Sequence, residues 1–504
     1  MCAPGSRVSP RVSAMSLQEI APAIGWIILV VDIVLRFVAL GVIPGNRRPS
    51  TGMAWLLLIL IEPIIGFGIF WLFGRTRLES GRVQRQKEAI AAIQGPAGEL
   101  HLDDDETQMR PAHRTITRLN RHLGALPLTG GNEIELHPDY ARVIGEMATE
   151  VDRAQAHVNV CFYITAWDEV TDPLFQALVR ATERGVKTRL LFDHLGTRGL
   201  PSYAELLRKL GETDIEWHAM LPIRPLKGTF RRPDLRNHRK ILVVDGSVGF
   251  TGSLNMTEPG YNKPKNHKLG REWVELMVRL EGPVVGALNA VFASDWYVET
   301  GEVIDLVEVP VEPDRRAEEI FDVPCQVVAS GPGIRSENNL RMFTSLIYSA
   351  TERISLTSPY FVPDESLLYA VTTAAQRGID VELFVSEVSD QFMVGHAQAS
   401  YYRALLEAGV RIYLYPAPYV LHAKHFTVDD DIAVVGSSNM DMRSFALNYE
   451  VTLLMPSTSV VTQMRRVQDT YRALSRELTL EEWGQRSAGT RYVDNVMRLT
   501  AALQ

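Results

Sequence analysis

Two stretches of the sequence carry the same polar side chains at the same spacing. Each has a histidine, a lysine two residues later and an aspartate five residues after the lysine. The six residues are His238, Lys240, Asp245, His422, Lys424 and Asp429. Because residues i and i+2 of a β-strand face the same side, each histidine and its lysine should project together. Such a pair in a single copy would mean little, but the two copies lie 184 residues apart.

The match continues beyond each aspartate. A Gly-Ser pair follows in both copies, with an asparagine two positions after the serine. These residues are Ser253 and Asn255 in the first copy and Ser437 and Asn439 in the second. Serine hydroxyls and asparagine amides are neutral hydrogen-bond donors suited to phosphate oxygens. The pattern therefore predicts four phosphate-binding side chains beside the histidines and lysines.

This set of groups suits the exchange of one phosphodiester for another. One neutral histidine can attack phosphorus and form a covalent phosphohistidine. The other, protonated, can donate to the leaving alkoxide and then accept the proton of the incoming hydroxyl. The two lysines can hold the non-bridging oxygens and offset charge that a metal would otherwise neutralise. We therefore predict no metal site and no cofactor.

The elements around the motifs also repeat. In each half a helix ends in an Arg-Gly-apolar turn, at Arg184-Gly185-Val186 and Arg377-Gly378-Ile379, and a strand follows. Glycine fits the left-handed position that ends a helix, and alternating strands and helices favour an α/β fold. We predict two similar lobes related by a pseudo-twofold axis, each with a mixed β-sheet flanked by helices, and a shared cleft between them.

The N-terminal part differs from the rest of the chain. Two apolar runs, about 22–43 and 53–73, are each long enough to cross a bilayer as helices. Seven basic residues flank the pair and two lie between the runs, which predicts a transmembrane hairpin with both ends in the cytoplasm. A pair of buried soluble helices is the alternative. Asp32, Arg36 and Glu62 are interpreted as a charge cluster that joins the two helices.

These observations give an expected division of the chain. The predicted parts are a membrane segment (1–74), a charged juxtamembrane linker (75–127), a first lobe (128–307, motif 238–255), a junction (308–324) and a second lobe (325–504, motif 422–439). The expected location is the cell membrane, as a multi-pass protein with its lobes on the cytoplasmic side.

Composition narrows the possible functions. The formal net charge is −8, so no overall basic field indicates nucleic acid. The three cysteines are far apart and form no disulfide framework. A local basic stretch, 223–240, contains Phe230 and could lie beside anionic head groups or be a solvated loop. The oligomeric state stays open.

The duplicated motif resembles the signature of the phospholipase D superfamily, and both copies are complete. Within it, the chain resembles the bacterial cardiolipin synthases of the phospholipase D type. The most specific matches are "NHRKILVVDGSVGFTGSLN", "SPYFVPDESLL" and "LHAKHFTVDDDIAVVGSSNMDMRSFALNYEV". The resemblance implies transfer of a phosphatidyl group between two phosphatidylglycerol molecules, release of glycerol, and contact with an anionic phospholipid membrane.

The resemblance also implies roles for individual residues. His238 and His422 would be the nucleophile and the acid/base, with family precedent favouring His238 as the nucleophile. Asp245 and Asp429 are expected to have structural roles at strand ends. The acidic residues that orient the histidines would be Glu450, in "NYEV", and Glu272, in "GREWVEL".

Two other functions remain open at this point. A membrane-bound hydrolase, or a transferase with a different acceptor, would share the chemistry up to the covalent intermediate. A lipid-binding scaffold with an inert fold is the alternative from another class, and the two intact motifs argue against it.

Overall fold

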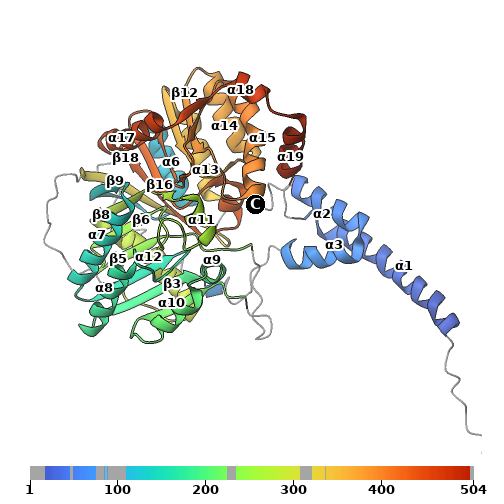
Figure 1. Ribbon diagram of the computed structural model, residues 1–504, viewed down its shortest axis with the longest axis horizontal. Helices are drawn as coiled ribbons and strands as arrows, with labels where there is room; N and C mark the ends of the chain where they lie inside the picture. Colours follow the sequence, from blue (N-terminus) through green and yellow to red (C-terminus); the bar gives the residue numbers. More distant parts are fainter. Residues whose placement is uncertain are drawn as a thin grey trace, which may run out of the picture. The chain divides into compact units, whose positions relative to one another are not determined.

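The computed structural model of the protein divides the chain into two compact units, Met1–Arg77 and Leu78–Gln504 (Figure 1). The structure describes residues 17–45, 49–74, 84–85, 88, 109–223, 234–306, 320–334 and 337–499. The two units are described separately below.

The N-terminal unit is made of short and long apolar helices. They are α1 (Leu17–Val42), α2 (Pro49–Ile61), α3 (Pro63–Ile69) and the π-helical turn η1 (Phe70–Gly74). Within the described residues, one helix is long and apolar enough to cross a bilayer, through Gly25–Val42. Its side chains are largely exposed in the unit, which suits a helix surrounded by lipid.

The second apolar run is not the single helix that its length predicts. It breaks at Glu62, and a new helix begins at Pro63. Proline lacks an N–H group and its ring clashes with the carbonyl four residues earlier, so it starts helices but interrupts them internally. The backbone at Gly66 packs so closely that a Cβ there would lie 2.9 Å from the Cα of Ile59. The expected hairpin of two full-length spans is therefore corrected to one long helix and two short ones.

The charged side chains of this unit only partly match the expected cluster. Asp32 and Arg36 form an ion pair of 3.0 Å one helical turn apart on α1. Glu62 makes no ion pair with any described residue and is exposed. It lies just before Pro63, where the helix is broken. The interhelical role predicted for Glu62 is therefore wrong.

The second unit is built on one continuous sheet of fifteen strands, in the order β19-β13-β12-β10-β15-β16-β18-β9-β1-β8-β6-β5-β2-β3-β4. The strands of the first half are β1 (Leu128–His137), β2 (His157–Phe162), β3 (Lys187–Asp193), β4 (Glu216–Met220), β5 (Ile241–Val244), β6 (Val248–Gly252) and β8 (Met277–Glu281). Those of the second half are β9 (Ile320–Ser330), β10 (Arg353–Thr357), β12 (Asp380–Ser386), β13 (Arg411–Tyr415), β15 (His425–Val428), β16 (Ile432–Gly436), β18 (Glu450–Pro456) and β19 (Arg476–Leu478).

The predicted repeat is visible in this order. The two halves meet where β1 pairs antiparallel with β9, and the strands then follow in matching sequence on either side. In each half, the parallel pairs lie farther from the centre than the antiparallel pairs. In the second half, β19 adds one antiparallel strand at the outer edge. The sheet is therefore mixed, as expected, but it is shared by the two lobes.

Helices cover both faces of the sheet. One face carries α7 (Tyr140–Arg153), α8 (Asp172–Glu183) and α10 (Tyr203–Leu210) in the first lobe, and α13 (Asn338–Ser349), α14 (Glu365–Gln376) and α15 (Phe392–Ala408) in the second. The opposite face carries α12 (Pro283–Thr300) and α17 (Thr458–Leu474), whose core includes residues of both lobes. A single apolar core therefore crosses the pseudo-twofold axis.

Short elements complete the unit (Figure 1). They are α6 (Pro111–His122), α9 (His194–Arg198), α11 (Pro264–Leu269), α16 (Met442–Ala446), α18 (Leu480–Gly484), α19 (Ala488–Arg498), β7 (Trp273–Val274), β11 (Phe361–Val362), β14 (Val420–Leu421) and β17 (Met440–Asp441).

Part of the predicted linker is folded. Helix α6 lies inside the segment 75–127, and its Ile116 belongs to the core of the second lobe. The Asn120 amide donates to Gln326 on β9 across 2.9 Å. Helix α6 is short and most of its residues are polar, so the sequence alone does not reveal that one of its faces is buried. Residues 308–319 of the predicted junction lie outside the described residues. The rest of the junction, 320–324, forms the start of β9.

The motif aspartates lie at the strand ends, as expected, where they accept hydrogen bonds from backbone N–H groups. Asp245 accepts from Gln155, Ala156 and His157 at 2.7–2.8 Å, at the start of β2. Asp429 accepts in the same way from the N–H groups of residues 351–353, at the start of β10. Each aspartate thus joins the end of its motif strand to the neighbouring strand.

We expect Asp245→Ala to lower the stability of the catalytic unit. The substitution leaves three backbone N–H groups without their acceptor, which should cost about 3 kcal/mol of unfolding free energy. Thermal unfolding of the detergent-solubilised protein, followed by circular dichroism, measures the loss. Asp305→Ala is the matched control, because Asp305 is exposed. Equal unfolding temperatures for the two variants would contradict the role assigned to Asp245.

Candidate active site

Each motif histidine is placed by backbone contacts with the opposite lobe. The N–H of His238 donates to the carbonyl of Tyr449 across 2.9 Å, beside a parallel bridge between Asn237 and Tyr449. The N–H of His422 donates to the carbonyl of Val274 across 2.8 Å, where β14 pairs with β7. The histidine of one lobe therefore lies against the strand of the other.

The same strands bring a carboxylate to each imidazole. Glu450 of the second lobe lies 3.3 Å from Nδ1 of His238. Glu275 of the first lobe lies 2.7 Å from Nδ1 of His422. The Asn448 amide also lies 3.2 Å from Nδ1 of His238. With Nδ1 of His238 occupied in this way, its Nε2 is the nitrogen left to react. On His422, Lys424 Nζ lies 3.1 Å from both Nδ1 and Nε2.

The structure corrects one of the two predicted carboxylates. Glu450 is in place, but the residue on His422 is Glu275 and not Glu272, whose side chain is exposed. Both glutamates occur in "GREWVEL", and Glu275 is the one followed by an apolar strand, as Glu450 is in "NYEV". That local pattern could have identified Glu275, whereas its distance from the motif could not.

The two motif serines have a different place from the predicted one. Ser253 and Ser437 are fully buried and do not line the cleft. Ser437 Oγ donates to Glu450 across 2.5 Å and accepts from the N–H of Val451. Ser253 Oγ accepts from the N–H of Leu276, directly after Glu275. The serines therefore hold the strands that carry the two glutamates, and their assignment as phosphate ligands is wrong.

The asparagines remain candidates for the phosphate. Asn255 and Asn439 both line the cleft. The Asn255 amide donates to the hydroxyl of Tyr261 across 2.7 Å. Oδ1 of Asn439 is buried without a hydrogen-bond partner among the described residues.

The two lysines are buried next to the histidines. Lys240 Nζ and Lys424 Nζ each donate to the carbonyl of the motif histidine, both across 2.6 Å. Burial lowers the pKa of Lys240, and it lowers that of Lys424 to about 7 in spite of the nearby Glu275. Two ammonium groups held away from water need anionic partners, so the site is suited to a bound anion.

Burial and charge act differently on the two imidazoles. Burial lowers the pKa of His238 to about 4, with Glu450 opposing the shift. Burial also lowers the pKa of His422, opposed by the closer carboxylate of Glu275. Burial alone would raise the pKa of Glu275, but the charge of His422 and its hydrogen bond lower it. The pKa of each imidazole is thus lowered by burial and by a nearby lysine, and a carboxylate from the other lobe opposes the shift.

Both histidines and both lysines line a single cleft of about 300 Å³. Aromatic rings form part of its wall: the ring of Tyr163 lies 4.1 Å from that of His238 and is tilted by 44° to it, and Tyr261 and Tyr360 lie 6.5 and 6.3 Å from the ring of His422. The cleft draws on both lobes, as predicted. Of the basic stretch 223–240, residues 224–233 lie outside the described residues.

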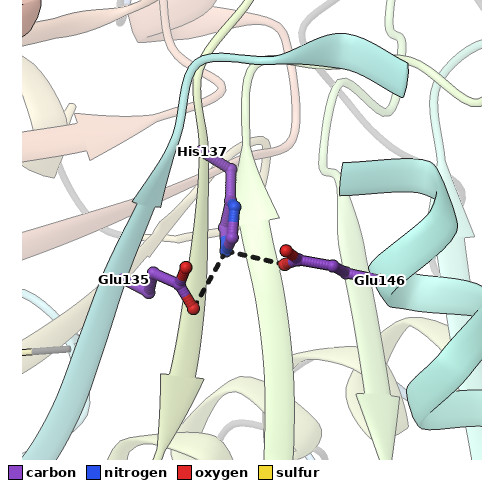
Figure 2. A group of neighbouring side chains, drawn as sticks. All are labelled: Glu135, His137 and Glu146. Carbon is purple, nitrogen blue, oxygen red and sulfur yellow. Dashed lines mark ion pairs between the residues drawn. The ribbon is translucent and has the colours of Figure 1, made fainter. Parts of the chain in front are cut away.

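A second group of ionisable side chains lies away from the cleft (Figure 2). His137 Nε2 is 3.0 Å from Glu146 and 3.5 Å from Glu135. Arg142 contacts the same two carboxylates, at 3.2 Å from Glu135 and 2.9 Å from Glu146. Two carboxylates and two basic groups thus form a compact ion network that links β1 to α7.

Comparisons with known proteins agree with this architecture. The family described as "Cardiolipin synthase, PLD-like domain" matches residues 147–296 and 343–470, one region in each lobe. A solved structure, a phosphatidylserine synthase from Haemophilus influenzae, superposes with a TM-score of 0.58 over 79% of this chain and 100% of that one, at 16% identity. That likeness shows the fold.

Full-length relatives are more similar. A protein named cardiolipin synthase A from Wigglesworthia glossinidia brevipalpis is 32% identical over 95% of this chain and 97% of its own length. One of the same name from Proteus mirabilis is 33% identical over 90% and 92%. With the family matched in both lobes and relatives similar over nearly the whole length, the chain belongs to the cardiolipin synthase family of phospholipase D-like phosphatidyltransferases.

Proposed function

We propose that the protein makes cardiolipin by transferring a phosphatidyl group from one phosphatidylglycerol to the hydroxyl of another, with release of glycerol. The observation that supports this most directly is the pair of histidine–glutamate contacts in one cleft, each made across the lobes. The names of the full-length relatives supply the substrate class.

The proposed reaction has two steps on the same phosphorus. Nε2 of His238 attacks, and the bond from phosphorus to the glycerol oxygen breaks while His422 gives its proton to that oxygen. Glycerol then leaves. The hydroxyl of a second phosphatidylglycerol gives its proton to His422 and attacks phosphorus, and the phosphorus–nitrogen bond breaks. Lys240 and Lys424 hold the non-bridging oxygens throughout.

The assignment of the two histidines follows from their surroundings. His238 is neutral at physiological pH because burial lowers its pKa to about 4. His422 has a carboxylate at 2.7 Å, which stabilises the imidazolium that a general acid requires. A bound phosphodiester would add a second negative charge beside His422 and so offset part of the lowering of its pKa by burial.

The products of the purified protein test this function. With phosphatidylglycerol as the lipid in detergent, we expect cardiolipin and free glycerol by mass spectrometry, and loss of at least about 10³-fold in rate for His238→Ala or His422→Ala. Phosphatidic acid without cardiolipin would indicate a hydrolase. Full turnover by either folded variant would rule out the catalytic role. A phosphatidyl adduct mapped to His422 would reverse the assignment of the two rings.

A pair of glutamate variants tests the carboxylate assignment. Phosphate binding needs Lys424 protonated, so kcat/KM should fall as pH rises above about 7. Glu275 raises the pKa values of Lys424 and His422, and Glu275→Gln should therefore shift this fall to lower pH and reduce the rate at pH 7 by about 100-fold. Glu272→Gln is the control and should keep the wild-type profile. A shifted profile for Glu272→Gln with an unshifted one for Glu275→Gln would return the role to Glu272.

We also propose that the chain is a multi-pass protein of the cell membrane, with the catalytic unit in the cytoplasm. Helix α1 supplies one crossing, and the apolar run that contains α2 and α3 would return the chain. The basic residues on both flanks support this orientation.

Cysteine labelling in intact cells tests the orientation. Cys161 and Cys325 are buried, so a Cys2→Ser background offers few competing thiols. A membrane-impermeant maleimide should label Gly45→Cys, in the turn after α1, from outside. It should label Asp305→Cys, on the surface of the catalytic unit, only after the membrane is opened. Labelling of Asp305→Cys in intact cells would contradict the proposed topology.

A further inference from the structure

The two lobes differ in length just beside the cleft. Ser253 bonds to the backbone of Leu276 as Ser437 bonds to that of Val451, so these positions correspond. The serine and its bonded residue are 23 positions apart in the first lobe and 14 in the second, so the segment between them is nine residues longer in the first lobe. The longer segment includes α11 (Pro264–Leu269), called the rim helix below.

One side of the rim helix is fixed to the protein. The buried Asn266 donates its amide to the carbonyl of Gly260 across 2.9 Å. The ring of His267 lies 2.8 Å from Glu258, which also accepts from the N–H of Gly260. Gly270, with a φ of 63°, ends the helix. The helix therefore has a defined position and a defined outer face.

The outer face of the rim helix has exposed basic and apolar side chains. Lys265, Lys268 and Leu269 are at positions i, i+3 and i+4, which lie on one side of a helix. All three are exposed, Leu269 to 48%. Neither lysine forms an ion pair with any residue in the described part of the chain. Lysines and an exposed apolar side chain on one helix face are features that the rim helix shares with helices that contact anionic membrane surfaces.

The rim helix begins directly after a residue of the cleft. Lys263, immediately before the rim helix, lines the cleft. On the other lobe Gln391 and Val394 line it, and between them Phe392 and Met393 are 68% and 43% exposed. Exposed apolar side chains thus belong to segments that contribute to the cleft from both lobes.

We propose that the rim helix is a membrane-contact element that rests on anionic phospholipid head groups and so brings the cleft to its lipid substrate. The charge of its two free lysines complements that of the lipid surface, and Leu269 enters the boundary between head groups and acyl chains. The inference rests on the proposed function, since that function makes membrane lipid the substrate.

Neutralising the two lysines tests the electrostatic part. The full-length protein and Lys265→Gln/Lys268→Gln are reconstituted into phosphatidylcholine vesicles with increasing mole fractions of phosphatidylglycerol. Each lysine near an anionic surface should strengthen contact roughly fivefold. We expect the double variant to need at least about fivefold more phosphatidylglycerol for half-maximal rate at low salt. The gap should close at high salt, because screening removes the contribution of the lysines from the wild type.

Two further measurements separate surface contact from a role inside the cleft. Short-chain phosphatidylglycerol dissolved as single molecules presents no surface, so the double variant should turn it over within about twofold of wild type. Leu269→Gln should lower the rate on vesicles at high salt as well, because apolar contact is not screened.

A charge-matched control is available in two basic residues that do not line the cleft. Lys187 is the first residue of β3 and pairs with His157, the first residue of β2. Arg466 is exposed on α17, next to Arg465, which contacts Asp429 at the end of the second motif strand. Lys187→Gln/Arg466→Gln should keep the wild-type dependence on phosphatidylglycerol.

Two results would overturn the proposal: a wild-type response of Lys265→Gln/Lys268→Gln on vesicles, or equal losses on vesicles and on dissolved lipid. If the wild type instead releases phosphatidic acid, the proposed function fails, while the rim helix can still be assessed by consumption of phosphatidylglycerol.

Discussion

The site depends on a reciprocal exchange between the two lobes. Each histidine belongs to one half of the repeat, and the carboxylate on its Nδ1 belongs to the other half. The exchange is fixed by backbone hydrogen bonds, from His238 to Tyr449 and from His422 to Val274. Neither lobe holds a complete histidine–carboxylate pair on its own. The two rings therefore reach one cleft only when both lobes are joined correctly.

The arrangement also explains how so many charges remain buried at one point. Two lysines, two glutamates and two histidines share a small volume, and every lysine or histidine lies near a carboxylate. Small differences in distance then separate the two imidazoles chemically. A carboxylate at 2.7 Å favours the imidazolium of His422, while His238 has a looser contact and a pKa of about 4. The two proposed roles, nucleophile and general acid, would rest on this difference between otherwise similar surroundings.

The sequence was sufficient for the parts of the structure that repeat with fixed spacing. The histidines, lysines and aspartates, the α/β class and the two-lobe organisation could all be predicted, because strand periodicity and the duplicated motif constrain them directly. The position of Glu275 could not be predicted from spacing, because the segment before it is nine residues longer than its counterpart. The two buried serines were wrongly predicted to bind phosphate. A serine whose hydroxyl bonds to a neighbouring strand and a serine whose hydroxyl faces a phosphate can have the same local sequence. The second apolar run was predicted to form one helix because it is long enough to cross a bilayer. The structure breaks this helix before Pro63, so a single proline had more effect than the length of the run.

The shared sheet has a consequence for how lipids reach and leave the site. The pairing of β1 with β9 and the core under α12 and α17 join the two lobes through one sheet and one apolar core. Lobes joined in this way are not expected to swing apart to admit a phospholipid or to release a product with four acyl chains. Under the proposed function, donor, acceptor and product would use the same cleft one after another. The order of arrival and departure would then depend on lateral diffusion of the lipids and on their competition for that cleft.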